Sequence, residues 1–313
     1  MGFCGRTIIL LLAVHLVLTA GLSGCTSGSA RRAQGNANRV VADDLGRQVS
    51  VTSETRRLIS LAPSVTETLF ALGLGDRVVG VTTYCDYPPE TATIEKVGDT
   101  QRPNLEKIIS LKPDLVIIST ASQLEEFVGN LERLGVPVYV NNPTDLGSLL
   151  HSIQRLGDVA GVPESASRLV VDLRARINDV HSKVASLRRP RVLLVLSSEP
   201  LITAGGTTFI NDLITEAGGD SISADQKADY PQFSLETALA RRPEVIFLQA
   251  GGPGLPKQLG DSPAVRAGRV YQLDDSILLR PGPRIVDGLE QVARKLHPEA
   301  FPGESRALSQ AND

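Results

Sequence analysis

The sequence predicts a two-lobed α/β protein in which each lobe is Rossmann-like, with a central parallel sheet, and one long, rigid helix joins the lobes. Three observations lead to this fold class. Short apolar runs alternate with helical patterns along two separate stretches of the chain. An uninterrupted helical pattern separates the two stretches, and a block of the first recurs in the second. Because ligands bind at the carboxyl ends of parallel strands, we expect a ligand cleft between the lobes.

The first lobe is expected over residues 40–162. It opens with a hairpin over residues 40–51 that turns at residues 44–46. The expected strands are 58–61, 78–81, 115–118 and 136–140, and the expected helices are 64–72, 104–111, 122–134 and 145–160. Ser64, with Glu67 three residues later, predicts a capping box at the start of the first of these helices.

The connecting helix is expected over residues 163–188, with Pro163 in its first turn. Its apolar residues recur at helical spacing and are Ala166, Leu169, Val170, Leu173, Ile177, Val180 and Val184. The second lobe, residues 189–301, has expected strands at 192–196, 245–248 and 270–273 and expected helices at 208–217, 234–240 and 283–296. Residues 302–313 are polar and are expected to be a disordered tail.

A block that recurs at an offset of 130 residues relates the two lobes. Residues 104–118 align without gaps on residues 234–248, and both blocks contain a cap, a Leu, a Glu, an apolar helix, a basic residue, a Pro and a buried strand. Glu106 and Glu236 are equivalent in this alignment. Each falls at the second residue of a helix, where the helix dipole alone favours an anion. Their equivalent placement also suits pairing with basic residues of a two-fold symmetric partner.

The N-terminus predicts export and lipid anchoring. Residues 1–24 contain a basic start, an apolar run at 8–18 and small residues before Cys25, as in a secretory signal peptide. Residues 22–25 resemble the bacterial lipobox, so we expect cleavage before Cys25 and acylation of its thiol. Residues 25–39 are small and polar and are expected to form a flexible tether. Cys4 leaves with the signal, and Cys85 then has no partner for a disulfide.

Composition and motifs exclude several classes of function. The chain has a net charge of −3 and no basic run, which argues against nucleic-acid binding. His15 lies in the signal peptide, and the other three histidines, His151, His181 and His297, lie on expected helices. HExxH, CxxC and GxSxG motifs are absent, so we expect no catalytic residues, no metal site and no cofactor. Residues 204–208 fit either a tight turn with a threonine cap or an anion-binding loop.

Loops at the strand ends hold the remaining candidates for ligand binding. Tyr84 and Tyr230 lie in two such loops, and each tyrosine offers a flat apolar face with a polar group at its tip. Tyr87, which precedes two prolines, is expected to pack its loop against its own lobe. Arg280 could bind an anionic group of a ligand or form a surface salt bridge. A hydrolase using the same cleft would need Ser64 or Cys85 as its nucleophile.

Several blocks in the same order resemble the cobalamin- and ferric-siderophore-binding proteins of ABC importers. These blocks are residues 57–73, 84–89, 104–118, 230–232 and 283–284. The resemblance covers roughly residues 40–297 and is strongest to the cobalamin-binding members. It implies two α/β lobes joined by a rigid helix, a ligand in the interlobe cleft and no enzymatic activity. It also implies that Glu106 and Glu236 dock onto arginines of the permease dimer.

The resemblance implies the ligand and the residues that contact it. A corrinoid is the favoured ligand, followed by a ferric siderophore or haem. The implied ligand-binding residues are Pro63, Ser64, Tyr84, Asp86, Thr100, Thr120, Tyr230 and Arg280. Tyr84 matches a stacking tyrosine and Arg280 a cleft arginine, whereas Thr100 and Thr120 replace cleft aromatics. The implied partners are a permease dimer with its ATPase subunits and, through Cys25, the extracytoplasmic face of a bacterial membrane; we expect a monomer.

Overall fold

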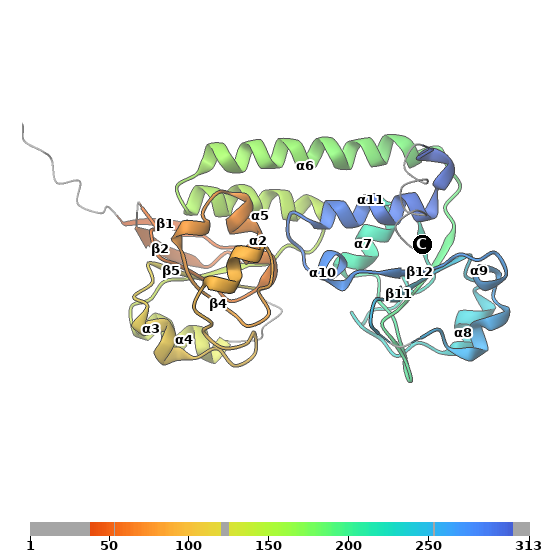
Figure 1. Ribbon diagram of the computed structural model, residues 1–313, viewed down its shortest axis with the longest axis horizontal. Coiled ribbons are helices and arrows are strands. Elements are labelled where there is room, and N and C mark those ends of the chain that lie inside the picture. The colour runs from red at the N-terminus through yellow and green to blue at the C-terminus, as the bar shows by residue number, and fades with distance from the viewer. Residues whose placement is uncertain (1–37, 53, 120–124, 253, 303–313) are drawn as a thin grey trace, which may run out of the picture. The chain divides into compact units, whose positions relative to one another are not determined.

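The computed structural model describes residues 38–302, except residues 53, 120–124 and 253 (Figure 1). The predicted signal peptide, Cys25, most of the tether, Thr120 and nearly all of the predicted tail therefore lie outside the described residues. The described residues all belong to one compact unit. No helix among the described residues is both long enough and apolar enough to cross a membrane.

The first half of the chain forms a hairpin and a four-stranded parallel sheet. The hairpin pairs β1 (Asn38–Ala42) with β2 (Gln48–Thr52), as predicted. The sheet has the order β4 (Val78–Val81), β3 (Leu58–Ser60), β5 (Leu115–Ser119) and β6 (Val138–Asn141). Its helices are α2 (Pro63–Ala71), α3 (Leu105–Ser110), α4 (Glu125–Arg133) and α5 (Leu146–Val159).

The second half repeats this plan. Its parallel sheet has the order β10 (Asp220–Ser221), β7 (Arg191–Val195), β11 (Val245–Gln249) and β12 (Val270–Leu273). A short antiparallel pair, β8 (Ser197–Ser198) and β9 (Leu201–Ile202), follows β7. The helices are α7 (Phe209–Glu216), α8 (Leu235–Ala240), α9 (Pro263–Arg266), α10 (Asp275–Leu278) and α11 (Ile285–Leu296). The predicted fold class, two α/β halves with parallel sheets, is confirmed.

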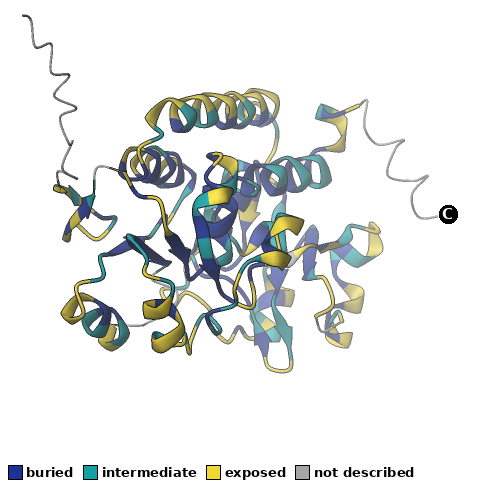
Figure 2. Ribbon diagram, turned by 60° about the vertical axis from the view of Figure 1, so that its left-hand side comes forward, coloured by how far each residue is buried: buried dark blue, intermediate teal, exposed yellow. Residues whose placement is uncertain are grey.

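Alternate residues of the central strands enter cores on opposite faces of each sheet. In β5, Leu115 and Ile117 belong to one hydrophobic cluster, while Val116 and Ile118 belong to another. All four are at most 4% exposed, which explains why the strand reads as a continuous apolar run rather than an alternating one. Figure 2 shows buried residues gathered on the strands and inner helix faces, with exposed residues on the outer face of α6.

The long helix α6 (Pro163–Val184) joins the two halves and is packed along much of its length. It lies beside α5 of the first half and α11 of the second (Figure 1). Its five fully buried residues are Ala166, Leu173, Ile177, Val180 and Val184, all of them predicted from helical spacing. Burial of each large member contributes roughly 1.5–3 kcal/mol. The helix is therefore held by a core on one face rather than spanning open solvent.

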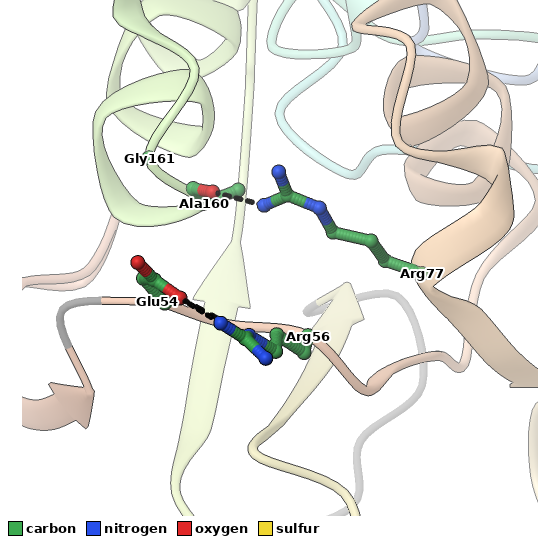
Figure 3. A pocket seen from close by; sticks show the side chains of 5 residues that line it. All are labelled: Glu54, Arg56, Arg77, Ala160 and Gly161. Atoms are coloured by element: carbon green, nitrogen blue, oxygen red, sulfur yellow. Dashed lines mark hydrogen bonds and ion pairs between the residues drawn. The ribbon is translucent and has the colours of Figure 1, made fainter. Parts of the chain in front are cut away.

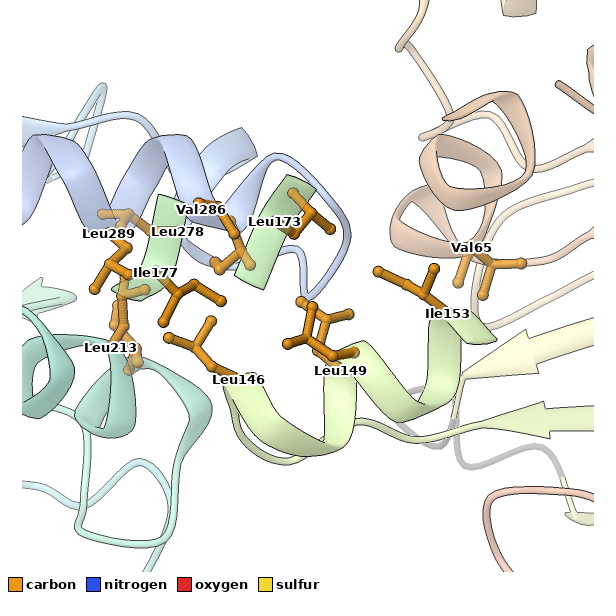
Figure 4. Packing of buried hydrophobic residues seen from close by; sticks show 14 of the residues in the cluster. Val65, Leu146, Leu149, Ile153, Leu173, Ile177, Leu213, Leu278, Val286 and Leu289 are labelled. Atoms are coloured by element: carbon orange, nitrogen blue, oxygen red, sulfur yellow. The ribbon is translucent and has the colours of Figure 1, made fainter. Parts of the chain in front are cut away.

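One continuous hydrophobic cluster connects the two halves beneath α6. Figure 4 shows Val65 of α2 and Ile153 of α5 at one end, and Leu213 of α7 and Leu289 of α11 at the other. A polar contact reinforces the connection, because the Leu146 amide at the start of α5 donates to the Asp212 carboxylate of α7 at 3.0 Å. Burial raises the pKa of Asp212. Interlobe stiffness thus comes from shared core as well as from the helix itself.

The predicted capping box at the start of α2 is wrong. The helix begins at Pro63, one residue earlier than predicted, and its N-cap residue is Ala62, which makes no side-chain capping bond. Pro63 suits the first helical position because that residue needs no amide donor and its φ angle is already helical. Ser64 therefore lies inside the helix. Glu67 is 4% exposed and makes a distant ion pair instead of a local cap.

Candidate functional site

A buried ion pair lies where the second half of the chain meets the first. Arg284, directly before α11, donates from Nε and Nη2 to the two carboxylate oxygens of Glu67 in α2, at 2.9 and 2.8 Å. The Glu67 side chain is only 2% exposed, and that of Arg284 is 20% exposed. The Glu67 hydrogen bonds raise the pKa of Arg284. This forked, desolvated pair joins residues 217 positions apart in the sequence.

Tyr87 packs against this pair and not only against its own loop. The Arg284 guanidinium carbon lies 3.9 Å from the centre of the Tyr87 ring, a cation–π distance. The expectation that Tyr87 packs its loop against its own lobe does not include this contact. A guanidinium from the other half lies over the ring, and Tyr87 remains 43% exposed. Tyr87 thus supports the junction between the halves.

Two residues predicted to bind the ligand, Asp86 and Arg280, pair with each other in this structure. Arg280 Nη1 and Nη2 lie 2.5 and 3.2 Å from the two Asp86 carboxylate oxygens, and Nη1 lies 3.6 Å from Glu67. The Arg280 hydrogen bonds lower the pKa of Asp86. The Asp86 side chain is 64% exposed and that of Arg280 is 21% exposed. Solvent can therefore reach the pair.

The first turn of α2 supports the loop that carries Arg280. A Cβ atom at Gly282 would lie 3.1 Å from the Ser64 carbonyl oxygen, so the two backbones are almost in contact. Ser64 itself is 6% exposed, and its carbonyl accepts a hydrogen bond from Thr68 at 2.8 Å. Pro63 is half-buried. Of these two predicted ligand-binding residues, Pro63 has the more accessible surface.

Exposed aromatic side chains in the described part of the chain are confined to the two predicted binding loops. Tyr84 is 56% exposed and Tyr230 is 58% exposed; with Tyr87, they complete this set of exposed aromatics. Thr100 is half-buried. Its loop turns at Asp99, whose carboxylate accepts hydrogen bonds from the amides of Gln101 and Arg102. Partial desolvation and the negative charge of Asp229 raise the pKa of Tyr230, so its phenol stays neutral.

The loop that carries Tyr230 is held by the turn at residues 204–208. The Gly205 and Gly206 amides donate to the carbonyl oxygens of Asp229 and Gln226 at 2.8 and 3.1 Å. A Cβ atom on Gly205 would lie 2.0 Å from the Ala228 carbonyl oxygen, so the approach requires glycine. Thr208 caps α7 through the Asn211 amide. Residues 204–208 therefore form the tight turn with a threonine cap, one of the two interpretations of the sequence. The Gly205 and Gly206 amides, which an anion-binding loop would offer to a ligand, already have hydrogen-bond partners.

The helices α3 and α8 match in structure as they do in sequence. Asn104 caps α3 and Ser234 caps α8, in both cases through the amide three residues on. Glu106 and Glu236 are exposed, and within the described chain neither carboxylate has a hydrogen-bond or ion-pair partner. Figure 1 shows both helices on the side of their sheets away from α6. Two equivalent carboxylates are therefore available to a partner on one side of the molecule.

The nucleophiles required by a hydrolase are enclosed. Cys85 is 1% exposed, and its sulfur lies 3.1 Å from the hydroxyl oxygens of both Thr66 and Thr82. Neither neighbour is a general base. In the described ranges, no group of three or more His, Cys, Asp or Glu residues is arranged to hold a metal ion.

A pocket outside the binding loops lies at the end of α5. It has a volume of about 460 Å³ and is lined by Glu54, Arg56, Arg77, Ala160 and Gly161 (Figure 3). Arg77 donates to the Ala160 carbonyl oxygen at 3.0 Å, and Arg56 pairs with Glu54 at 2.5 Å. Arg77 also donates to the Thr55 carbonyl oxygen at 3.2 Å, so Arg77 holds the chain before β3 against the end of α5. None of the predicted ligand-binding residues lines this pocket.

Sequence reasoning missed Arg284 and misassigned Glu67. Pro283 and Arg284 belong to a block that resembles a known family, but no local pattern indicates that Arg284 reaches a buried carboxylate in α2. Glu67 fits a capping box in sequence because a serine precedes it by three residues. The signal that could have separated the two interpretations is Pro63, which favours the first helical position and moves Ser64 inside the helix.

Comparison with known proteins gives consistent matches over most of the chain. A family model described as periplasmic binding protein matches residues 58–277. A vitamin B12-binding protein of Vibrio cholerae is 35% identical over 244 residues, which cover 77% of this chain and 88% of that protein. An uncharacterized ABC transporter substrate-binding lipoprotein of Bacillus subtilis is 33% identical over 304 residues, which cover 93% and 96% of the two chains.

Solved structures give the same result. The crystal structure of a periplasmic vitamin B12 binding protein of Vibrio cholerae aligns with a TM-score of 0.71 at 35% identity, covering 79% of this chain and 98% of that one. A periplasmic heme-binding protein of Roseiflexus, in its apo form, aligns with a TM-score of 0.70 at 29% identity, covering 79% and 99%. The likeness therefore extends to proteins that bind two different macrocycles.

Proposed function

Because the chain belongs to the periplasmic binding protein family, we propose that it captures a corrinoid of the cobalamin type and delivers it to the permease of an ABC importer. Relatives named as vitamin B12-binding proteins and as an ABC transporter substrate-binding lipoprotein support this role. The observation that carries the choice of ligand is the placement of the exposed aromatics. Tyr84 and Tyr230 present large flat side chains on loops that follow parallel strands, where α/β proteins bind ligands.

Flat, neutral side chains suit the face of a corrin macrocycle. A tyrosine ring buries a large apolar area against such a face and keeps its hydroxyl for a polar contact. Asp86 and Arg280 supply an acceptor and a donor beside Tyr84, and the amide side chains of a corrinoid need both. Pro63 and Thr100 add partly exposed surface to the same site, and we retain Ser64 and Thr120 in the proposed set.

A ferric siderophore or haem is the alternative ligand, and the relative that binds heme supports it. Two observations favour the corrinoid over haem. The raised pKa of Tyr230 disfavours the phenolate form that a tyrosine needs in order to bind iron. The described residues also offer no cluster of metal ligands. A cobalt corrinoid carries its own axial ligand and makes no such demand on the protein.

Delivery is assigned to Glu106 and Glu236. One carboxylate on each half suits a permease with two equivalent subunits, each offering an arginine. In this proposal the protein acts as a monomer, its permease partner associates with ATPase subunits, and the chain catalyses no reaction itself. The Glu106→Gln/Glu236→Gln variant should lose uptake of cyanocobalamin and keep its affinity for the ligand. A loss of affinity would contradict the docking role.

Anchoring is assigned to Cys25. The sequence features of residues 1–25 and the lipoprotein relative support processing before Cys25 and acylation of its thiol. The mature chain would then stand on a short tether outside the cytoplasm. The Cys25→Ser replacement should release the protein from the membrane and abolish labelling by radioactive palmitate. If the variant stays at the membrane and is still labelled, Cys25 is not the anchor.

The ligand assignment is tested with aromatic variants. Equilibrium dialysis against cyanocobalamin, followed at its visible absorption band, should show about tenfold weaker binding for Tyr84→Ala and for Tyr230→Ala. Val171→Ala removes a 68% exposed side chain from α6 and serves as the control, with unchanged binding. If both tyrosine variants bind cyanocobalamin as tightly as the parent, the proposed stacking site is wrong.

A further inference from the structure

A matched pair of exposed apolar side chains lies outside the binding loops. Ile109 on α3 is 38% exposed, and Leu239 on α8 is 37% exposed. The two positions are 130 residues apart, which is the offset of the repeat. Ten large apolar or tyrosine side chains are exposed in the described ranges, and these two are the one pair related by that offset. Single exposed apolar residues are ordinary on protein surfaces. A pair that repeats at equivalent positions of the two halves indicates a shared function for these side chains.

The backbone confirms that the two positions are equivalent. Ile108 and Ala238, the neighbouring residues, are both 0% exposed and fix the inner face of each helix. Two residues after the end of each helix, Lys112 and Arg242 have positive φ angles of 47° and 51° and are the non-glycine residues with this conformation in the described chain. These also lie 130 residues apart. The outward direction of Ile109 and Leu239 therefore repeats with the same local geometry.

Each apolar side chain lies one helical turn from a docking carboxylate. Residues three apart on a helix are surface neighbours, so Ile109 adjoins Glu106 and Leu239 adjoins Glu236. Each half thus presents a carboxylate and an apolar group side by side on a six-residue helix. We propose that Ile109 and Leu239 are apolar contacts of the permease dimer, one per subunit, beside the ion pairs made by Glu106 and Glu236.

The symmetry and the charge of these two surfaces indicate which kind of partner binds them. A partner with two equivalent subunits presents the same patch twice, as the repeat requires, and the patch that meets each half must combine a cation with apolar surface. Apolar contacts dehydrate the neighbouring ion pairs and so strengthen them. This inference rests on the proposed function, because it specifies the surface by which the same delivery partner is recognised.

The test compares two matched double variants on the importer. Ile109→Ala/Leu239→Ala is measured against Val40→Ala/Val171→Ala, which removes side chains that are 65% and 68% exposed on β1 and α6. Alanine favours helix, so the first variant should fold normally, which circular dichroism and its affinity for cyanocobalamin verify. Binding of each cyanocobalamin-loaded protein to the organism's importer in nanodiscs is followed by biolayer interferometry, at low salt and at high salt.

We expect the Ile109→Ala/Leu239→Ala variant to bind the importer about tenfold more weakly and the control to bind within twofold of the parent. The loss should persist at high salt, because apolar contacts are not screened. Binding of the first variant within twofold of the parent, with Glu106→Gln/Glu236→Gln impaired, would overturn this inference and leave the docking role intact. If the parent itself fails to bind the importer, the proposed function fails, and this inference fails with it.

Discussion

Replacement of Arg284 by methionine should destabilise the protein strongly, because it leaves a buried carboxylate without its main partner. The Glu67 side chain is 2% exposed and receives two hydrogen bonds from Arg284. Breaking such a pair from one side costs about 3–5 kcal/mol. Arg280 lies 3.6 Å from the same carboxylate and can compensate in part, so we expect about 3 kcal/mol. For a domain of this size, that corresponds to a fall in Tm of roughly 6–12 °C.

The assay is urea unfolding followed by circular dichroism, with a matched control. Arg188 makes a forked pair with Glu244 at 3.0 and 3.0 Å, but its side chain is 69% exposed. Arg188→Met should therefore cost less than about 1 kcal/mol. Each variant breaks an arginine–glutamate pair with two hydrogen bonds, and the two pairs differ in burial. Equal losses for Arg284→Met and Arg188→Met would refute the argument that burial makes the Arg284 pair important.

A double-mutant cycle measures the coupling directly. Glu67→Gln leaves Arg284 partly exposed and able to turn toward solvent, so its cost should be smaller, about 1–2 kcal/mol. The Glu67→Gln/Arg284→Met variant should cost less than Arg284→Met alone, because no unpaired charge is then buried. The sum of the single losses should therefore exceed the loss in the double variant by at least about 1 kcal/mol. Additive losses would mean that the two side chains do not interact.

Two further predictions concern acid stability and the turn beneath Tyr230. Hydrogen bonds from Arg188 lower the pKa of Glu244 to about 2 from 4.5, so this carboxylate stabilises the fold above pH 4.5, and that contribution is lost as the pH falls toward 2. Glu244→Gln should flatten the stability profile across that window in urea titrations, and an unchanged slope would contradict it. Gly205→Ala should cost at least about 2 kcal/mol and weaken cyanocobalamin binding, because the added Cβ meets the Ala228 carbonyl oxygen at 2.0 Å. Gly129→Ala in α4, where the nearest atom to the added Cβ is the end of the Arg133 side chain at 3.8 Å, should be neutral or stabilising by up to about 1 kcal/mol. A Gly205→Ala variant that melts at the same temperature as Gly129→Ala would show that the turn tolerates a side chain.

Periodic and repeated features of this fold could be predicted from the sequence. The buried face of α6 follows from apolar spacing alone, and the repeat identifies α3 and α8 with their caps, Asn104 and Ser234. Local chemistry is sufficient in these cases because neighbours in the sequence are neighbours in the helix. The exposed positions of Glu106 and Glu236 agree with their place on the outer side of these short helices.

Contacts between distant segments could not be predicted in the same way. Glu67 and Arg284 meet only because α2 and the loop before α11 lie together, and neither sequence neighbourhood indicates a partner 217 residues away. The cation–π contact of Tyr87 with Arg284 depends on the same arrangement. Asp86 was expected to bind a ligand and Arg280 either to bind a ligand or to form a surface salt bridge, but the sequence did not indicate that Asp86 is the partner of Arg280. Such contacts can be identified only from the tertiary fold, because it is the fold, and not the local sequence pattern, that brings the two side chains together.

The identity of the ligand is tested most directly by calorimetric titration of the purified chain. Cyanocobalamin, haemin and ferrichrome are titrated separately into protein freed of any co-purified ligand. We expect one-to-one binding of cyanocobalamin with a dissociation constant between nanomolar and micromolar, and weaker or no binding of the two iron compounds. No heat of binding with cyanocobalamin, together with saturable binding of haemin or ferrichrome, would contradict it.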